Sequence, residues 1–177
     1  ITWFYVSTSN SAGTINPEPD SYVTYNYVEN AWSIGTMDRT VWSDSFGARN
    51  VPFAFDPDGL LYNHETGTSD NGSAMSSYIE SSPREITQNG ENLFMVDKVI
   101  PDVTMTSDTN LYFNLNSRKY PNATEVVKGP FTITSTTQKV STRAKGRQIA
   151  MKIYSTGTTD EWSIGDFRIN AREDSLR

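Results

Sequence analysis

Short stretches of alternating apolar and polar residues constrain the fold of this chain more than any other feature. The clearest lies at Thr109–Asn116, where Leu111, Phe113 and Leu115 take every second position, with Asn or Tyr between them. A period of two puts alternate side chains on opposite faces of a strand, so this pattern predicts a strand with one buried face. Further short strands are expected at Thr2–Ser7, Tyr22–Asn26, Ala31–Gly35, Val51–Phe55, Leu60–His64, Gly129–Thr137, Arg147–Tyr154 and Glu161–Asn170.

The composition agrees with a β protein. The chain holds 21 Thr and 20 Ser but only 9 Ala and 6 Leu, so strong helix formers are scarce. Turn-forming residues such as Asp56-Pro57-Asp58-Gly59 separate the strand candidates, which is typical of consecutive antiparallel strands. Leu93–Val99 is apolar at both alternating sets of positions, and we expect that strand to be buried on both faces. The predicted fold class is all-β.

One four-residue segment occurs twice, and it suggests a finer architecture. Trp32-Ser33-Ile34-Gly35 recurs 130 residues later as Trp162-Ser163-Ile164-Gly165. The recurrence indicates either a shared way of ending a strand or repeated units such as propeller blades of about 40–50 residues. On the second interpretation we predict antiparallel β-propeller blades, with residues 1–77 as a blade-like region and residues 78–177 as a second β region continuing the propeller. The alternatives are a β-sandwich-like insertion between residues 78 and 140, or a β-sandwich instead.

The residue inventory offers little for catalysis or for binding a metal. The chain has no Cys and one His, which excludes a disulfide scaffold, a thiolate metal site and a multi-histidine metal site. His64 beside Glu65 has no nucleophile motif with it, and we interpret it as structural. We therefore predict no catalytic residue, no cofactor and no metal, and the absence of a long apolar stretch predicts no membrane span.

Charge is distributed unevenly along the chain, whose net charge is −6. Residues 1–117 carry a net −11, residues 118–152 a net +7, and residues 153–177 a net −2. Within the basic segment, Arg143, Lys145 and Arg147 would share one face of a strand that continues to Ile149, Met151 and Ile153 as its core-facing end. We interpret Arg143, Lys145 and Arg147 either as a solvated edge or as a contact to an acidic partner or phosphate; the candidate site is an assembly contact.

Several segments, taken in order, resemble one known family. They are Tyr25–Gly35, Arg39–Asp44, Leu61–Gly67, Tyr78–Ser81, Val99–Asp102, Arg118–Pro121, Gly129–Phe131, Arg143–Ala150 and Trp162–Ile169. This order resembles the C-terminal part of the tail hub or nozzle proteins of short-tailed bacteriophages, β-propeller proteins that include DNA-stabilisation proteins. The resemblance covers roughly residues 20–170 and brings no catalytic residues with it.

The resemblance implies a virion structural protein of a phage tail. Such proteins form homo-oligomeric rings, usually hexamers, around the DNA exit channel, contact neighbouring tail or adaptor proteins, and retain the packaged genome until ejection. Their chains are longer than this one, which agrees with our expectation that Ile1 is a processed start or lies within a longer polypeptide. A net negative chain would let genomic DNA pass without sequence-specific contact, because each Lys or Arg contact to phosphate adds affinity.

Two other functions are compatible with the sequence. A carbohydrate- or surface-binding β module would use the 4 Trp and 9 Tyr as a stacking platform. A glycoside-acting enzyme would need two carboxylates across a cleft, for which Asp38, Asp44, Asp56 and Asp58 are the candidates.

Overall fold

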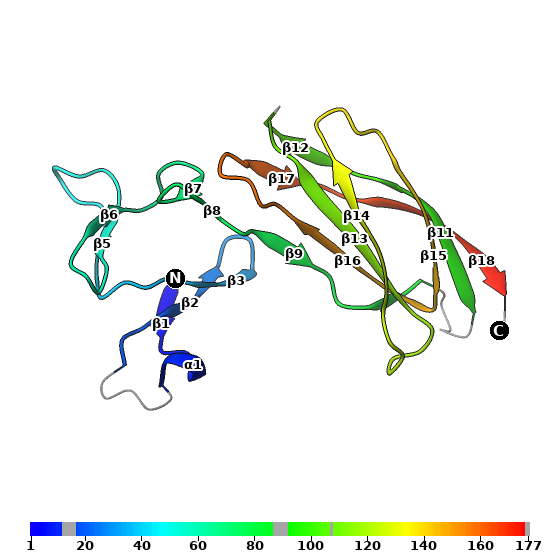
Figure 1. Ribbon diagram of the computed structural model, residues 1–177, viewed down its shortest axis with the longest axis horizontal. Coiled ribbons are helices and arrows are strands. Elements are labelled where there is room, and N and C mark those ends of the chain that lie inside the picture. The colour runs from blue at the N-terminus through cyan, green and yellow to red at the C-terminus, as the bar shows by residue number, and fades with distance from the viewer. Residues whose placement is uncertain (12–16, 87–91, 107, 176–177) are drawn as a thin grey trace. The chain divides into compact units, whose positions relative to one another are not determined.

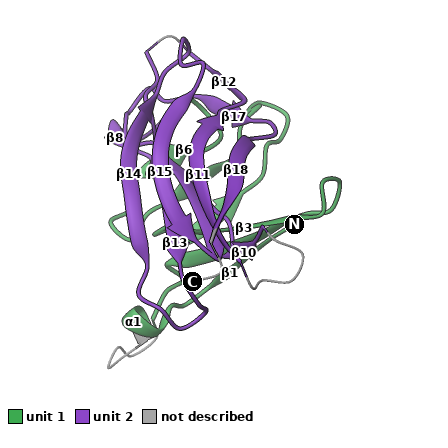
Figure 2. Ribbon diagram, turned by 90° about the vertical axis from the view of Figure 1, so that its right-hand side faces the viewer, with its two compact units in different colours: residues 1–67 green, residues 68–177 purple. Residues whose placement is uncertain are grey.

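The protein is all-β and forms two compact units. The structure is a computed structural model that describes residues 1–11, 17–86, 92–106 and 108–175. Unit 1 comprises Ile1–Gly67 and unit 2 comprises Thr68–Arg177 (Figures 1 and 2). Every strand pair in the described chain is antiparallel, and none of its sheets closes into a barrel, which confirms the predicted fold class. The units divide at Gly67, whereas the sequence placed a boundary after residue 77.

Unit 1 contains two three-stranded sheets. The first has the order β1-β2-β3, and a four-residue helix, α1 (Thr8–Ser11), follows β1. The second has the order β4-β5-β6. The strands are β1 (Thr2–Tyr5), β2 (Ser21–Asn26), β3 (Ala31–Thr36), β4 (Val41–Ser43), β5 (Phe53–Phe55) and β6 (Leu61–Asn63).

Local turn chemistry closes the hairpins of unit 1. Asn26 Oδ1 accepts the N–H groups of Val28 and Glu29, which fixes the turn between β2 and β3. At the turn between β5 and β6, Asp56 Oδ1 accepts the N–H of Leu60 at 2.8 Å, and Gly59 adopts a positive φ of 82°. Asp56 therefore acts as the turn residue that the sequence predicts.

Unit 2 contains the larger sheets. One has the order β10-β16-β13-β14, with β9 also paired to β16, and the other has the order β15-β11-β18. Two small pairs, β12-β17 and β7-β8, accompany them. The strands are β7 (Ser69–Asp70), β8 (Ser73–Ala74), β9 (Tyr78–Glu80), β10 (Arg84–Glu85), β11 (Leu93–Ile100), β12 (Val103–Met105), β13 (Leu111–Arg118), β14 (Val126–Ile133), β15 (Val140–Gly146), β16 (Gln148–Tyr154), β17 (Trp162–Ile164) and β18 (Arg168–Ser175).

The two larger sheets of unit 2 enclose one apolar core. Leu111, Phe113 and Leu115 of β13 are fully buried, as their alternation predicts. From the other sheet, β11 and β15 contribute to the same cluster, whose further members include Phe94, Val96, Val99, Ile133, Val140, Ala144, Ile149 and Ile153. A shared cluster of this size is where most of the hydrophobic stabilisation of the described chain is concentrated.

The outer face of β11 differs from its prediction. Val96 and Val99 are buried, but Met95, Asp97 and Lys98 are only half-buried, so the expected burial on both faces is wrong. The pairing of β11 with both neighbours shifts between Val96 and Lys98, which marks a β-bulge at Asp97. The reason is the layer count: β11 lies in a sheet that has the core on one side only.

The chain changes sheets between β15 and β16, at Gly146 and Arg147. The N–H of Arg147 donates to the carbonyl oxygen of Arg118 at the end of β13, at 2.8 Å. A Cβ on Gly146 would lie 2.7 Å from that same carbonyl oxygen and 3.1 Å from the Arg118 nitrogen. The predicted single strand from Arg143 to Ile153 is therefore wrong, because the backbone turns a corner here. Ile149 and Ile153 do face the core, as predicted.

This corner yields a stability prediction. Replacing Gly146 with Ala puts a methyl group against the β13 backbone, which cannot move aside as a side chain can. We expect the free energy of unfolding to fall by about 1–3 kcal/mol, measured by chemical denaturation of the full chain. Gly165→Ala is the matched control, because the nearest atoms to a Cβ there belong to the side-chain carboxylate of Asp102, and it should cost about 1 kcal/mol or less. Equal losses for the two variants would contradict the steric account of the corner.

Candidate functional site

The β1-β2-β3 sheet of unit 1 presents an exposed apolar surface, which we call the aromatic face. It consists of Trp3, Val23, Tyr25, Trp32 and Ile34. The register places Trp3 opposite Val23, Val23 opposite Ile34, and Tyr25 opposite Trp32, so all five side chains share one side of the sheet. The Trp32 ring stacks on Tyr25 with centroids 4.5 Å apart and on Trp3 with centroids 6.0 Å apart.

Unit 1 leaves this face uncovered. The exposed fractions are 46% for Trp3, 63% for Trp32 and 72% for Ile34. Among the described apolar residues of unit 1, only Ala54 is fully buried. Contiguous exposed apolar surface of this kind marks an interaction site more often than a free surface.

The second copy of the Trp-Ser-Ile-Gly segment packs differently from the first. In unit 2, Trp162 and Ile164 of β17 pack against the core, and the Trp162 Nε1–H donates to Ser155 Oγ at 3.0 Å. In unit 1 the equivalent Trp32 and Ile34 point to solvent. The glycines have a common use, since Gly35 leaves room for the Tyr22 ring and Gly165 leaves room for the Asp102 carboxylate. These contacts support a shared strand-end chemistry as one reason for the recurrence.

Asp20 stabilises one end of the β1-β2-β3 sheet through hydrogen bonds to Ser7. Its carboxylate accepts the Ser7 N–H at 2.7 Å and the Ser7 hydroxyl at 2.6 Å, which ties the residues after β1 to the start of β2. These hydrogen bonds stabilise the charged form, so the hydroxyl and the N–H of Ser7 hold the pKa of Asp20 below its ordinary value of 3.8.

The β15-β11-β18 sheet of unit 2 presents a second surface on the side away from the core, which we call the basic face. Its cations come from three strands that are distant in sequence: Lys98, Arg143, Lys145, Arg168 and Arg172. The register places Lys145 opposite Met95 and Met95 opposite Arg172, and it places Lys98 between Ser141 and Asn170. Figure 2 shows β15, β11 and β18 side by side.

The cations of the basic face differ in their partners. Lys145 forms an ion pair with Asp174, and the Arg172 guanidinium contacts Met95 Sδ at 3.8 Å. Arg143 and Arg168 are exposed, and the described chain supplies neither with a hydrogen bond or an ion pair. These two guanidinium groups are therefore available to a partner.

Only part of the predicted assembly contact lies on one surface. Arg143 and Lys145 occupy outward positions on β15, two residues apart as the sequence predicts. Arg147 lies at the corner between the two sheets and is not on the strand with them. Sequence reasoning missed Lys98, Arg168 and Arg172. Lys98 lies in a segment that the sequence predicts to be buried on both faces, and nothing local in the sequence says which strands are neighbours.

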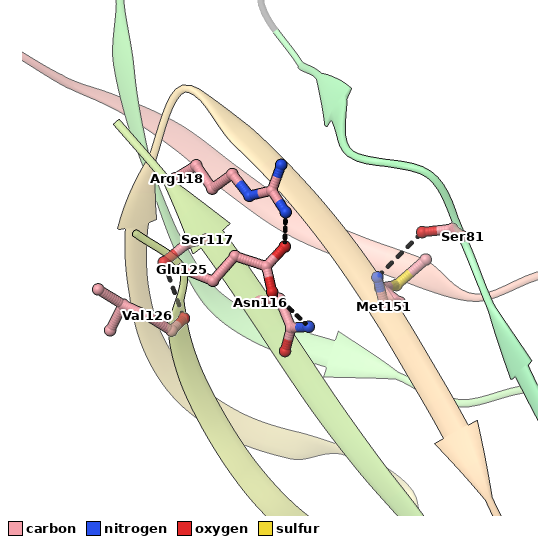
Figure 3. Close-up of polar contacts among 7 residues, drawn as sticks. All are labelled: Ser81, Asn116, Ser117, Arg118, Glu125, Val126 and Met151. Atoms are coloured by element: carbon pink, nitrogen blue, oxygen red, sulfur yellow. Dashed lines mark hydrogen bonds and ion pairs between the residues drawn. The ribbon is translucent and has the colours of Figure 1, made fainter. Parts of the chain in front are cut away.

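Other basic residues of segment 118–152 are engaged within unit 2. Figure 3 shows Arg118 at the end of β13 in an ion pair with Glu125, whose second carboxylate oxygen accepts the Asn116 side-chain amide at 3.4 Å. Lys152 pairs with Glu80 at 3.2 Å. The net charge of the segment therefore overstates what it offers to a partner.

His64 lies in an aromatic and cationic cluster on the second sheet of unit 1. Its ring centroid lies 4.7 Å from the Trp42 ring centroid, and its Nε2 accepts a hydrogen bond from Arg39 Nε at 3.2 Å. The Arg39 guanidinium also lies 4.4 Å from the Tyr62 ring centroid, and burial raises the pKa of Tyr62. These contacts agree with the structural interpretation of His64.

Within the described residues no group of three or more His, Cys, Asp or Glu side chains is arranged to hold a metal ion. No described helix is long and apolar enough to cross a membrane. A comparison with protein-family models finds none that matches the chain, and a comparison with curated proteins finds no significant match.

The Asp20 bridge yields a pH prediction. Because the folded-state pKa of Asp20 lies below its unfolded value, its hydrogen bonds stabilise the folded chain at neutral pH, and this contribution disappears as the pH falls through the folded-state value. Asp20→Asn should therefore destabilise unit 1 at neutral pH and have little effect well below pH 3.8. Urea denaturation at neutral pH and at low pH, followed by the fluorescence of the unit 1 tryptophans, measures the stability of the variant and of the wild type under both conditions. Asp44→Asn is the control, and an Asp20→Asn effect independent of pH would contradict the account.

Proposed function

We propose that this chain is a structural assembly protein of a bacteriophage tail, one subunit of a homo-oligomeric ring, by expectation a hexamer. In this role it contacts neighbouring tail or adaptor proteins, lines the DNA exit channel and helps to retain the genome until ejection, so its location is the virion. The main support for assembly is the exposed aromatic face of unit 1. The proposal assigns no catalytic residue and no cofactor.

Covering the aromatic face with a partner is energetically favourable. Burying a large apolar side chain contributes about 1.5–3 kcal/mol, and unit 1 leaves two tryptophans and an isoleucine exposed on one side of a three-stranded sheet. Aromatic side chains are enriched at the centres of protein interfaces. A partner that covers the aromatic face would supply the hydrophobic contact that unit 1 by itself does not make.

The phage-tail part of the proposal comes from the resemblance. The ordered segments run from about residue 20 to residue 170 and so draw on both units. The net charge of −6 is compatible with a channel past which DNA slides, because few cations would hold the phosphates.

For the fold of unit 2 we propose a β-sandwich rather than propeller blades. Consecutive strands β15 and β16 belong to different sheets (Figure 1). Side chains from both of those sheets form the core. A propeller blade keeps its consecutive strands in one sheet, whereas a sandwich allows the chain to cross between sheets. The two small sheets of unit 1 remain candidates for blade-like elements.

A carbohydrate-binding module is the second candidate, and the same face favours it. The stacked rings of Trp3, Tyr25 and Trp32 form a continuous aromatic surface of the kind on which sugar rings can lie. On this interpretation the aromatic face binds a glycan and the chain works without forming a ring.

The first test is the native mass of the full chain, with negative-stain images of the same sample. We expect a closed ring. Arg143→Glu should weaken assembly about tenfold or more, because it places an acidic group on the basic face, whereas Lys128→Glu on β14 serves as the control and should assemble normally. A chain that stays monomeric at every concentration would contradict the ring.

A glycan-binding screen tests the second candidate. If the aromatic face is a sugar platform, Trp32→Ala should abolish binding in the screen, while Tyr120→Ala, a change at an exposed aromatic residue of unit 2, should leave it intact. On our proposal the wild-type chain binds no glycan in the screen.

A further inference from the structure

We propose that the aromatic face of one copy docks on the basic face of a second copy, so that subunits join head to tail. The inference rests on the proposed function, because it names the two surfaces through which the ring would close. Two different surfaces joined this way form a heterologous contact, and such contacts generate closed rings when the rotation between subunits closes.

Charge complementarity selects this partner. Unit 1 holds eight acidic and two basic residues, a net −6, whereas unit 2 holds thirteen of each and is neutral. Unit 2 nevertheless gathers five cations on the outer side of one sheet, of which Lys145 is already paired with Asp174. The acidic unit of one copy and the basic face of another therefore attract each other, and two aromatic faces would bring two acidic units together.

Acidic groups also lie at the ends of the aromatic face. Glu29 lies in the turn between β2 and β3, and Asp38 follows β3; both are exposed. Acids at the rim around an apolar centre match a surface that carries cations around Met95 and Ile100, the outward apolar residues of β11. The charges at the rim would fix how the two surfaces align, and the apolar centre would supply the buried area of the interface.

The residue types at the centre are also complementary. Arginine is the cation that stacks most readily on an indole ring, and Arg143 and Arg168 have no hydrogen bond or ion pair in the described chain. Trp32 offers 63% of its surface to such a contact. Docking would therefore bring guanidinium groups that have no hydrogen bond or ion pair in the described chain against exposed indole rings.

The edge strands of the sheets also favour a partner at unit 1. β3 pairs with β2 over six residues without a register shift and carries no charge and no proline, whereas β18 carries several charges and β14 carries Lys128 and Pro130. Charges, prolines and bulges at an edge prevent unwanted strand pairing. Unit 2 has these protections and the edge of β3 does not, as expected where a partner covers that part of the sheet.

Mixing two variants tests the head-to-tail contact in the full chain. The aromatic-face variant is Ile34→Lys, and Trp32→Thr with Ile34→Thr is its second version. The basic-face variant is Arg143→Glu with Arg168→Glu. Far-ultraviolet circular dichroism and the urea midpoint confirm that each is folded, and Val126→Thr and Lys128→Glu are the matched controls on β14.

We expect each face variant alone to need at least about a tenfold higher concentration to assemble than the wild type. An equimolar mixture of the two should form a heterodimer and nothing larger, because each variant keeps one intact surface. Both controls should assemble like the wild type. Native mass spectrometry reads all of these states.

Three other outcomes of this experiment are possible, and each overturns the head-to-tail contact. A wild-type ring with no heterodimer in the mixture, or with assembly lost only in the aromatic-face variant, would refute the pairing and leave the ring proposal standing. Normal assembly of the basic-face variant together with loss of binding to a DNA duplex would assign the basic face to nucleic acid. A wild type that is monomeric at every concentration overturns the ring proposal itself.

Discussion

The apolar core shared by the two larger sheets of unit 2 is the constraint on which the rest of that unit depends. Neither sheet could bury its inner side chains alone, and Phe113 of β13 belongs to the same core cluster as residues of β11 and β15. Placing β15 and β16 in different sheets requires a tight corner. Gly146 provides it, because the β13 backbone passes where any side chain would lie. The shared core thus requires the backbone to turn between β15 and β16, and this turn separates Arg147 from the basic face.

Unit 1 is organised by a different balance. Its sheets have three strands each and almost no interior, so stability within the unit comes from hairpin turns, ring stacking and the Asp20 bridge. Large aromatic side chains in such a sheet remain exposed unless something covers them. The structure therefore places most of the hydrophobic stabilisation in one unit and most of the unused apolar surface in the other.

The two proposals follow from this contrast. A chain with one acidic unit that exposes an aromatic face, and one neutral unit that exposes a basic face, carries two complementary surfaces. Electrostatic attraction brings such surfaces together and orients them, while apolar burial holds them. Glycan binding would use only the first surface and would leave the basic face without a role.

How far the sequence could predict this protein is clear from individual residues. The alternation of Leu111, Phe113 and Leu115 predicted a buried face correctly, because a period of two is imposed by the strand itself. The same logic failed at Lys98, because an apolar run does not reveal whether its sheet is covered on one side or on both. It failed again at Arg147, where the close approach of a strand distant in sequence ends β15.

The sequence by itself determined the fold class, the turns and the outward positions of Arg143 and Lys145, since all of these depend on backbone period and local side-chain chemistry. Only the tertiary structure decided which strands became neighbours. It gathered Lys98, Arg168 and Arg172 beside Arg143 and Lys145, and it packed Trp162 and Ile164 of one Trp-Ser-Ile-Gly segment against the core while leaving Trp32 and Ile34 of the other exposed. The physical reason is that strand pairing and burial are properties of residues distant along the chain, so identical local sequences meet different surroundings.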